Sequence, residues 1–166
     1  IRDRADEGLR IVCIDIAHGD HILMKDAIKH VRENYPDLFV IAGNVGTAEG
    51  YKRLSQWGAH AVRLSVGSGS ICTTRIQTGH GVPTMQAIMD AYQVKCDLER
   101  NENHAAKIIA DGGIKNSGDI VKCLAVGADY VMLGSMLSGT KETPGKAIIL
   151  PDGSKAKRYN LSLIHI

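Results

Sequence analysis

The chain has 166 residues, of which 44% are hydrophobic and 23% charged, and this composition suffices for one globular core. Its formal net charge of +2 is too small, and its Lys and Arg residues too scattered, to indicate a nucleic-acid partner. Four cysteines without zinc-like spacing, and no apolar leader or membrane-length run, favour a soluble protein of the reducing cytoplasm with no membrane partner.

Five short apolar runs rich in Val, Ile and Leu predict buried parallel strands, at residues 11–17, 39–44, 61–66, 107–111 and 130–134. Between them, apolar residues recur at helical spacing, as at positions 24, 27, 28 and 31. Asn116 or Ser117 can cap a helix start, and Gly58 and Gly127 follow helix ends. The alternation predicts an α/β fold, either a doubly wound sheet or part of an eight-stranded β/α barrel.

Polar residues follow the carboxyl end of every predicted strand, at 15, 44, 67–72, 111–113 and 134–135. In a barrel these ends meet at one mouth, whereas in an open sheet only the strands near the switch point share a site. Five contributing strands favour the barrel. No Gly-x-Gly-x-x-Gly opens a helix, so a Rossmann dinucleotide site has little support.

A cysteine lies inside the glycine-rich turn that follows the third apolar run, Gly-Ser-Gly-Ser-Ile-Cys-Thr-Thr-Arg at residues 67–75. Glycines allow close approach of backbone to ligand, and free amides and hydroxyls can hold phosphate. A thiol is nucleophilic as its thiolate, which nearby positive potential from Arg75 or oriented amides would favour. The alternative is a turn in which Cys72 merely packs.

Four ordered motifs on successive βα units resemble the IMP dehydrogenase and GMP reductase family: residues 67–75, Ala-Asp-Gly-Gly-Ile at 110–114, Gly-Ser-Met-Leu at 134–137, and Gly-Thr-Lys-Glu-Thr-Pro-Gly at 139–145. The resemblance covers residues 11–159. It implies that residues 1–159 are a partial TIM (β/α)8 barrel, roughly the last five βα units, without the first three strands or a regulatory insert. Because such a fragment leaves two strand edges unpaired, we expect it to fold only when chains associate.

The resemblance implies the catalytic residues. Cys72 resembles the nucleophile that adds to purine carbon 2, Thr74 the residue that handles the proton or water, and Glu142 an acid near the catalytic water or leaving group. For Glu142 the alternative is a solvated loop glutamate. Covalent addition makes the flat purine carbon tetrahedral, so that hydride can leave to a nicotinamide.

The resemblance also implies the substrate and cofactor contacts. Asp111 resembles the residue that accepts hydrogen bonds from the ribose diol, and the phosphate contacts would be Ser70, Gly113, Gly134 and Ser135. Asp15, Asn44 and Arg63 resemble the residues along the nicotinamide and ribose of NAD, or alternatively NADP. An arginine within a buried strand should face the mouth or a carboxylate such as Asp15, or else form an interior structural ion pair.

Dehydrogenases of the family bind a monovalent cation through backbone carbonyls of the cysteine loop, which here would be those of Gly67, Gly69 and Cys72. The remaining potassium ligands belong to a more C-terminal segment, so we do not expect a complete site in this chain.

Other features have plainer interpretations. The acids and histidines of residues 15–21 suggest a metal site, but they match a cofactor-facing loop of the family better. We expect His30, His60 and His104 at the surface, and Cys13 and Cys123 as small core residues. Residues 92–106 predict a helix extension and a surface loop. Two departures from the family pattern are Thr84, where glutamine is common, and residues 160–166, which we interpret as a truncated or artefactual tail.

The resemblance therefore favours an IMP dehydrogenase that oxidises IMP to XMP with NAD in guanine nucleotide biosynthesis, with a homotetrameric parent protein. Residues 69–75 and 138–140 resemble bacterial dehydrogenases slightly more than reductases. One alternative is GMP reductase, which would convert GMP to IMP and ammonia with NADPH. The other is a catalytically silent fragment that binds a purine nucleoside monophosphate or mediates assembly.

Overall fold

The computed structural model describes residues 8–102 and 104–157, and the tail at 160–166 lies outside them. Five parallel strands form the body: β1 (Ile11–Asp15), β2 (Phe39–Val45), β3 (Ala61–Leu64), β4 (Lys107–Asp111) and β5 (Tyr130–Met132). The helices are α2 (Ile22–Asn34), α3 (Ala48–Gln56), α4 (Thr74–Thr78), α5 (Thr84–Asn101) and α6 (Ser117–Ala125). The strand positions predicted from the apolar runs are thus confirmed, with ends that differ by one or two residues.

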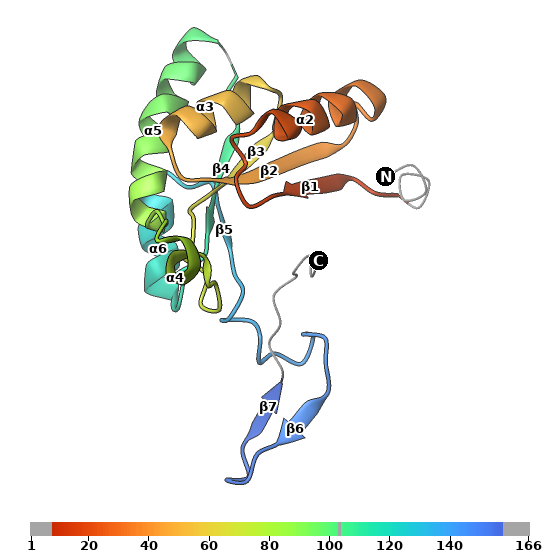
Figure 1. The fold of residues 1–166 in the computed structure, drawn as a ribbon, viewed down its shortest axis with the longest axis vertical. Coiled ribbons are helices and arrows are strands. Elements are labelled where there is room, and N and C mark those ends of the chain that lie inside the picture. The colour runs from red at the N-terminus through yellow and green to blue at the C-terminus, as the bar shows by residue number, and fades with distance from the viewer. Residues whose placement is uncertain (1–7, 103, 158–166) are drawn as a thin grey trace.

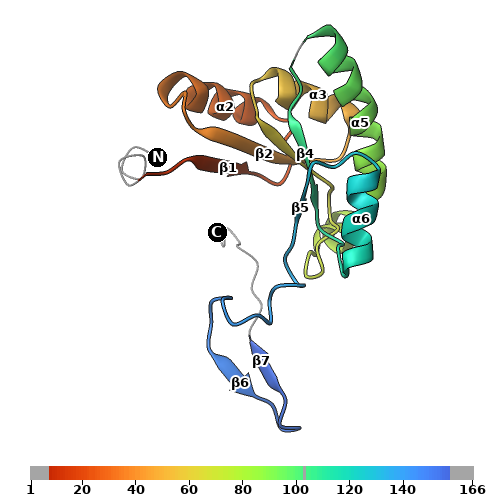
Figure 2. The same cartoon turned by 180° about the vertical axis from the view of Figure 1, so that it is seen from behind.

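The sheet has the order β1-β2-β3-β4-β5, in which each strand pairs with its neighbour in sequence (Figure 1). Right-handed crossovers that always step in the same direction leave the helices of these crossovers on one face of the sheet. Figures 1 and 2 show α2, α3 and α5 together on one side. The order never reverses, so the sheet has no switch point and the doubly wound alternative is wrong.

The hydrophobic core lies between this sheet face and the helices. Alternate strand residues such as Val40, Val62 and Ile108 are fully buried against helix residues that include Tyr51 and Ile88. The opposite sheet face is largely uncovered at its outer strands, where Ile11 is 55% and Tyr130 54% exposed. The core therefore fixes the strands from one side and leaves the other side accessible.

Local capping follows the sequence closely. The side chain of Asn116 accepts a hydrogen bond from the backbone N–H of Asp119, which selects Asn116 over Ser117 as the cap of α6. Gly58 and Gly127 follow α3 and α6 with φ of +102° and +115°, as predicted for residues that end helices. Helix α5 extends to Asn101, which confirms the predicted helix extension.

Two predictions about buried residues are wrong. Cys13 is exposed because it lies on the uncovered face of the sheet, whereas Cys123 is buried as expected. His60 is half-buried, since its ring stacks on Phe39 and its Nδ1 accepts a hydrogen bond from the N–H of Val40. His30 and His104 are exposed, as predicted.

A hairpin of β6 (Ala147–Ile149) and β7 (Lys155–Lys157) follows the sheet and was not predicted. It stands away from the five-stranded body in both views (Figures 1 and 2). Among the described residues, no helix is long and apolar enough to cross a membrane.

Candidate active site

Four predicted residues meet at the carboxyl ends of β1 to β4. The guanidinium of Arg63 lies 2.7 Å from Asp111 Oδ2 and 3.0 Å from Asp15 Oδ2. The Asn44 amide donates to the same Asp111 oxygen at 2.8 Å. The prediction that Arg63 would meet a carboxylate such as Asp15 is confirmed, and Asp111 is its closer partner. We call these four residues the polar cluster.

The backbone of β2 makes room for the polar cluster. Gly43 pairs with Arg63 across the sheet, and a Cβ at position 43 would lie 2.7 Å from the Arg63 Cβ. The register then shifts between Gly43 and Val45, which frees Asn44 from the ladder. Its amide can therefore turn to Asp111 and to the carbonyl of Ser65, 3.2 Å away.

Electrostatics hold the cluster together. Burial by itself lowers the pKa of the Arg63 guanidinium, but the charges and hydrogen bonds of Asp111 and Asp15 outweigh it and raise that pKa further above its ordinary value. The Arg63 side chain is 13% exposed and stays charged. With two carboxylates and one guanidinium, the cluster has a formal charge of −1.

The cluster presents hydrogen-bond acceptors to a ligand. The donors of Arg63 and of the Asn44 amide are directed at Asp111, Asp15, the Ser65 carbonyl and the Cys13 sulfur. Within residues 8–102 and 104–157, no donor reaches the Oδ1 atoms of Asp15, Asn44 and Asp111. This set suits hydroxyls and amide N–H groups, such as those of a ribose or a nicotinamide carboxamide, and disfavours a phosphate.

Ser65 joins the polar cluster to the cysteine loop and was not singled out from the sequence. It is buried and has a φ of +113°, a strained value for a residue with a side chain. Its hydroxyl donates to the Asp111 carbonyl, and its N–H donates to the Val45 carbonyl at 3.0 Å. A serine after an apolar strand is too common a pattern to reveal this role.

The cysteine loop, residues 66–82, is closed at its base by hydrogen bonds between Val66 and Val82. Within it, the N–H of Cys72 donates to the Gly69 carbonyl at 3.1 Å, so the chain turns tightly before α4. The Cys72 thiol is half-buried and donates to the hydroxyl of Thr74 at 3.2 Å. The structure thus brings together these two predicted residues.

The cysteine loop packs on the turn after β4. A Cβ at Gly112 would lie 3.0 Å from the Gly69 nitrogen, and the Thr84 hydroxyl donates to the Gly112 carbonyl at 2.8 Å. Thr84, the departure noted in the sequence, therefore ties the start of α5 to the turn that carries Asp111. Apart from the departure itself, no sequence pattern indicates this contact.

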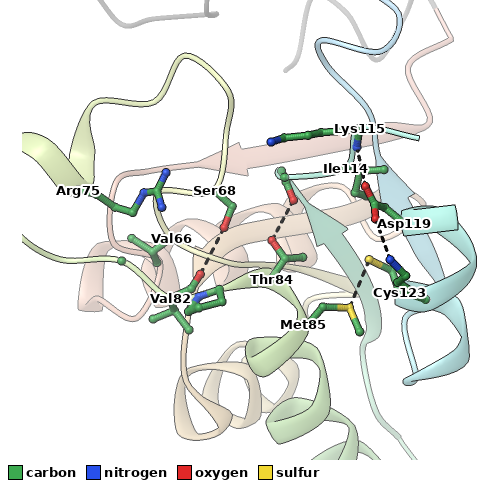
Figure 3. Close-up of a pocket in the computed structure, with 15 residues that line it drawn as sticks. Val66, Ser68, Arg75, Val82, Thr84, Met85, Ile114, Lys115, Asp119 and Cys123 are labelled. Atoms are coloured by element: carbon green, nitrogen blue, oxygen red, sulfur yellow. Dashed lines mark hydrogen bonds and ion pairs between the residues drawn. The ribbon is translucent and has the colours of Figure 1, made fainter. Parts of the chain in front are cut away.

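A cavity of about 530 Å³ is lined by residues of the cysteine loop, the start of α5, the turn after β4 and α6 (Figure 3). Its wall includes Ser68, Arg75, Thr84 and Lys115. Arg75 lies along the loop base, where a Cβ at Gly67 or Gly81 would be 2.6 Å from its Cγ. No hydrogen bond joins Arg75 to Cys72 in the described part of the chain.

The remaining predicted residues lie on loops after β3, β4 and β5. Ser70 and Gly113 are exposed on the cysteine loop and the β4 turn, while Gly134 and Ser135 are exposed after β5. Glu142 is exposed on the loop before β6, and no hydrogen bond or ion pair with another described residue involves its side chain. The structure therefore does not join Glu142 to Cys72.

The loop after β1 has structural roles. The N–H of Gly19 donates to the Asn44 carbonyl at 2.8 Å, Asp20 pairs with Arg53, and the His21 ring caps α2. Across residues 8–102 and 104–157, no three His, Cys, Asp or Glu side chains gather as a metal site would require.

Comparison with known proteins identifies the chain's relatives. The model of the IMP dehydrogenase / GMP reductase domain matches residues 2–161. Inosine-5'-monophosphate dehydrogenase of Aquifex aeolicus is 48% identical over 143 residues, covering 86% of this chain and 28% of the relative. That of Staphylococcus aureus strain Mu50 is 47% identical over 154 residues, covering 93% and 30%.

A solved structure also resembles the fold. A cysteine-to-alanine variant of GMP reductase from Trypanosoma brucei, in complex with guanosine 5'-monophosphate, has a TM-score of 0.82 and 38% identity. The similarity covers 92% of this chain and 31% of that one, so this chain spans about a third or less of the relatives named here. The chain belongs to the IMP dehydrogenase / GMP reductase family of oxidoreductases.

Proposed function

We propose that the chain is part of an IMP dehydrogenase, which oxidises IMP to XMP with NAD in guanine nucleotide biosynthesis. The observation that carries the proposal is the packing of the cysteine loop on the turn after Asp111, where Gly69 and Gly112 are in contact. This packing brings the loop that carries Cys72 against the turn that follows Asp111, whose Oδ1 accepts no hydrogen bond from a described residue. The motif and the family supply the reaction that such a pair would serve.

In the proposed reaction, the sulfur of Cys72 adds to carbon 2 of the purine and forms a covalent adduct. Carbon 2 becomes tetrahedral and loses a hydride with its electron pair. Water then attacks carbon 2, the thiolate leaves, and XMP is released. Thr74, which accepts the thiol hydrogen bond at 3.2 Å, would take part in the proton transfers. Glu142 would act near the water, after a change in the loop that carries it.

Asp111 would bind the ribose diol through Oδ1, while Arg63 and Asn44 hold Oδ2. Ser70, Gly113, Gly134 and Ser135 would bind the phosphate, for which exposed amides and hydroxyls are suited.

Asp15, Asn44 and Arg63 would line the nicotinamide side of the cofactor. The Oδ1 atoms of Asp15 and Asn44 can accept hydrogen bonds from hydroxyl and carboxamide groups, and Arg63, which has donors only, would hold Asp15 in place through Oδ2. When bound, NAD or NADP supplies the hydride acceptor. A potassium ion would bind carbonyls of Gly67, Gly69 and Cys72. The Gly69 carbonyl, which accepts the Cys72 N–H, keeps a second lone pair for such a role.

We further propose that the five strands are a sector of an eight-stranded barrel, in a parent that is a homotetramer in the cytoplasm. Support comes from the uniform strand order and the uncovered inner face with Ile11 and Tyr130. We expect the isolated chain to associate, because its edge strands are open. Sedimentation and urea unfolding test this, and cooperative unfolding as a monomer at low concentration would contradict it.

Trapping of Cys72 tests the enzymatic proposal. A 2-halogenated purine nucleoside monophosphate should alkylate Cys72, with carbon 2 bonding to sulfur and halide leaving. Peptide mass spectrometry should find the label on Cys72 and not on the exposed Cys13, and excess IMP should suppress it. Equal labelling of Cys13 and Cys72, unaffected by IMP, would overturn a specific nucleotide site.

GMP reductase remains a second candidate, because the structural similarity to the Trypanosoma brucei enzyme extends over 92% of this chain. An assay of the longer parent with IMP plus NAD, and with GMP plus NADPH, separates the two activities. Reduction of GMP without turnover of IMP would reverse our preference. A nucleotide that binds without alkylating Cys72 would instead favour the catalytically silent fragment.

A further inference from the structure

The ammonium of Lys157, on β7, is surrounded by backbone carbonyls of the loop before β6. It donates to the carbonyls of Thr140, Thr143 and Lys141, at 2.8, 2.7 and 3.3 Å. These three bonds use all three of its hydrogens. Within residues 8–102 and 104–157, no carboxylate lies at ion-pair distance from Lys157, so its charge is satisfied by carbonyl dipoles.

Such a ring of carbonyls resembles the oxygen environment that proteins provide for a hard monovalent cation. Each carbonyl is part of the peptide backbone, so the ammonium constrains the path of the main chain. The other lysine of β7, Lys155, has an exposed side chain and makes no such contact in the described structure. The neighbouring lysine thus provides a matched comparison.

The bound loop is connected by hydrogen bonds back to β5. The Leu137 carbonyl accepts from both hydroxyls of Thr140 and Thr143, at 2.9 and 2.6 Å. The N–H of Leu137 donates to the Gly134 carbonyl at 3.0 Å, and the Ser138 hydroxyl donates to the Ser135 carbonyl at 2.7 Å. A continuous series of bonds therefore runs from the hairpin to the residues after β5.

We propose that Lys157 is a positioning residue that acts as a built-in monovalent cation. Its ammonium orders residues 134–143 and couples the β6–β7 hairpin to them. The catalytic consequence rests on the proposed function, because this loop carries Ser135 and Glu142. The ordering itself is a property of the chain and needs no substrate.

Hydrogen exchange tests the ordering. In Lys157→Met, the amides of Leu137, Ser138 and Thr140 should exchange about tenfold faster, because charged hydrogen bonds of the loop are lost. In the control Lys155→Met they should exchange as in the parent chain. The proposal is overturned if these amides exchange at the same rate in the two variants, whether both keep the parent protection or both lose it.

Chemical rescue distinguishes a cation from a mere packing contact. In Lys157→Ala, added methylammonium should restore most of the lost protection, since it supplies a charged N–H donor. Tetramethylammonium at the same ionic strength carries the charge without N–H groups and should not restore it. If neither salt restores protection, or both do equally, the proposal fails. If Lys157→Ala also loosens the five-stranded sheet, the difference between methylammonium and tetramethylammonium still tests whether a charged N–H donor orders the loop.

A separate assay addresses the catalytic consequence. In a longer parent that turns over IMP, Lys157→Met should lower kcat by about tenfold. The rate of Cys72 alkylation at saturating 2-halogenated nucleotide should stay within about twofold, because saturation offsets any weaker phosphate contact at Ser135. Faster exchange without a change in kcat would confine Lys157 to ordering the loop, and would overturn its catalytic consequence. Absence of Cys72 alkylation would instead count against the proposed function.

Discussion

Charged clusters lie at both ends of the sheet, and they differ in how completely their carboxylates are bonded. At the amino ends of the strands, Asp129 Oδ1 contacts Lys95 and Lys107, and its Oδ2 contacts Lys95 and the N–H of Ile108. At the carboxyl ends, Arg63 and Asn44 both bond Asp111 Oδ2, while no described residue donates to its Oδ1.

The difference shows how a structural carboxylate can be told from a binding one. Burial raises the pKa of Asp129, but the Ile108 N–H and the Lys95 ammonium outweigh it and leave that pKa lowered. Its bonding capacity is used by the fold. Asp111 is held through Oδ2 alone, so its carboxylate has a fixed orientation while Oδ1 can still accept a hydrogen bond from a ligand. We infer that the amino end stabilises the chain and that the carboxyl end binds ligand.

The largest expected effect is on stability. Asp129→Asn should reduce the free energy of unfolding by about 3 kcal/mol, because it leaves the buried Lys95 ammonium with only its longer 3.9 Å ion pair to the half-exposed Glu99. Asp111→Asn should have a smaller effect, since Arg63 keeps Asp15. Urea unfolding of both variants measures the difference. A greater loss for Asp111→Asn would reverse our assignment of the two clusters.

The second prediction concerns ligand binding. Asp111→Asn should slow alkylation of Cys72 by the 2-halogenated nucleotide by about tenfold or more, because a charged hydrogen-bond acceptor for the ribose is lost. Asp129→Asn, assayed below its unfolding midpoint, should label at nearly the parent rate. Labelling kinetics followed by mass spectrometry give both rates. Unchanged labelling of Asp111→Asn would remove the ribose role.

The third prediction sharpens how the polar cluster is positioned. Gly43→Ala introduces a Cβ about 2.7 Å from the Arg63 Cβ and 2.9 Å from its carbonyl oxygen, so the strand backbone must shift. We expect a destabilisation of about 1–3 kcal/mol together with slower Cys72 labelling. Gly139→Ala is the control, because nothing lies within 4 Å of a Cβ there. Equal behaviour of the two variants would show that the close contact is unimportant.

The smallest expected effect is the contribution of His60, which lies at the amino end of β3, to the pH dependence of stability. Burial, followed by the charge of Arg32, lowers the pKa of His60 below its ordinary value. The folded state therefore favours the neutral ring. The neutral His60 ring therefore contributes fully to stability above the unfolded pKa of about 6.5. This contribution is lost as pH falls from there toward the lowered folded pKa.

Urea midpoints at pH 7.5 and 5.5 measure this contribution. The parent chain should lose more stability between these values than His60→Gln does. His30→Gln, which alters an exposed ring, should behave like the parent. A parent and a His60→Gln variant with the same pH dependence would exclude His60 as a contributor.

The fold followed from the sequence where local patterns decide structure. Valine-rich and isoleucine-rich runs predicted all five strands, and Asn116, Gly58 and Gly127 marked helix ends because capping depends on a few neighbouring residues. Cys13 was misjudged because burial depends on which face of a strand is covered. The β6–β7 hairpin was missed because its strands are only three residues long.

The sequence indicated which residues form the polar cluster better than it indicated which residues contact one another across the fold. Arg63 was expected to meet a carboxylate because an unpaired buried guanidinium is costly, and it does so. The contacts of Ser65, Thr84 and Lys157 were not predictable, since each joins segments that are separated by 14 to 46 residues. No local pattern reports such a pairing.

The sequence by itself determined the βα alternation, the family and the placing of polar residues just after each strand, because periodicity and motif spacing are local properties of the chain. Only the tertiary structure decided which oxygen of Asp111 is held and which is free, and that the Lys157 ammonium lies among three carbonyls. Those outcomes depend on strand register and loop packing, which bring distant residues within hydrogen-bond distance.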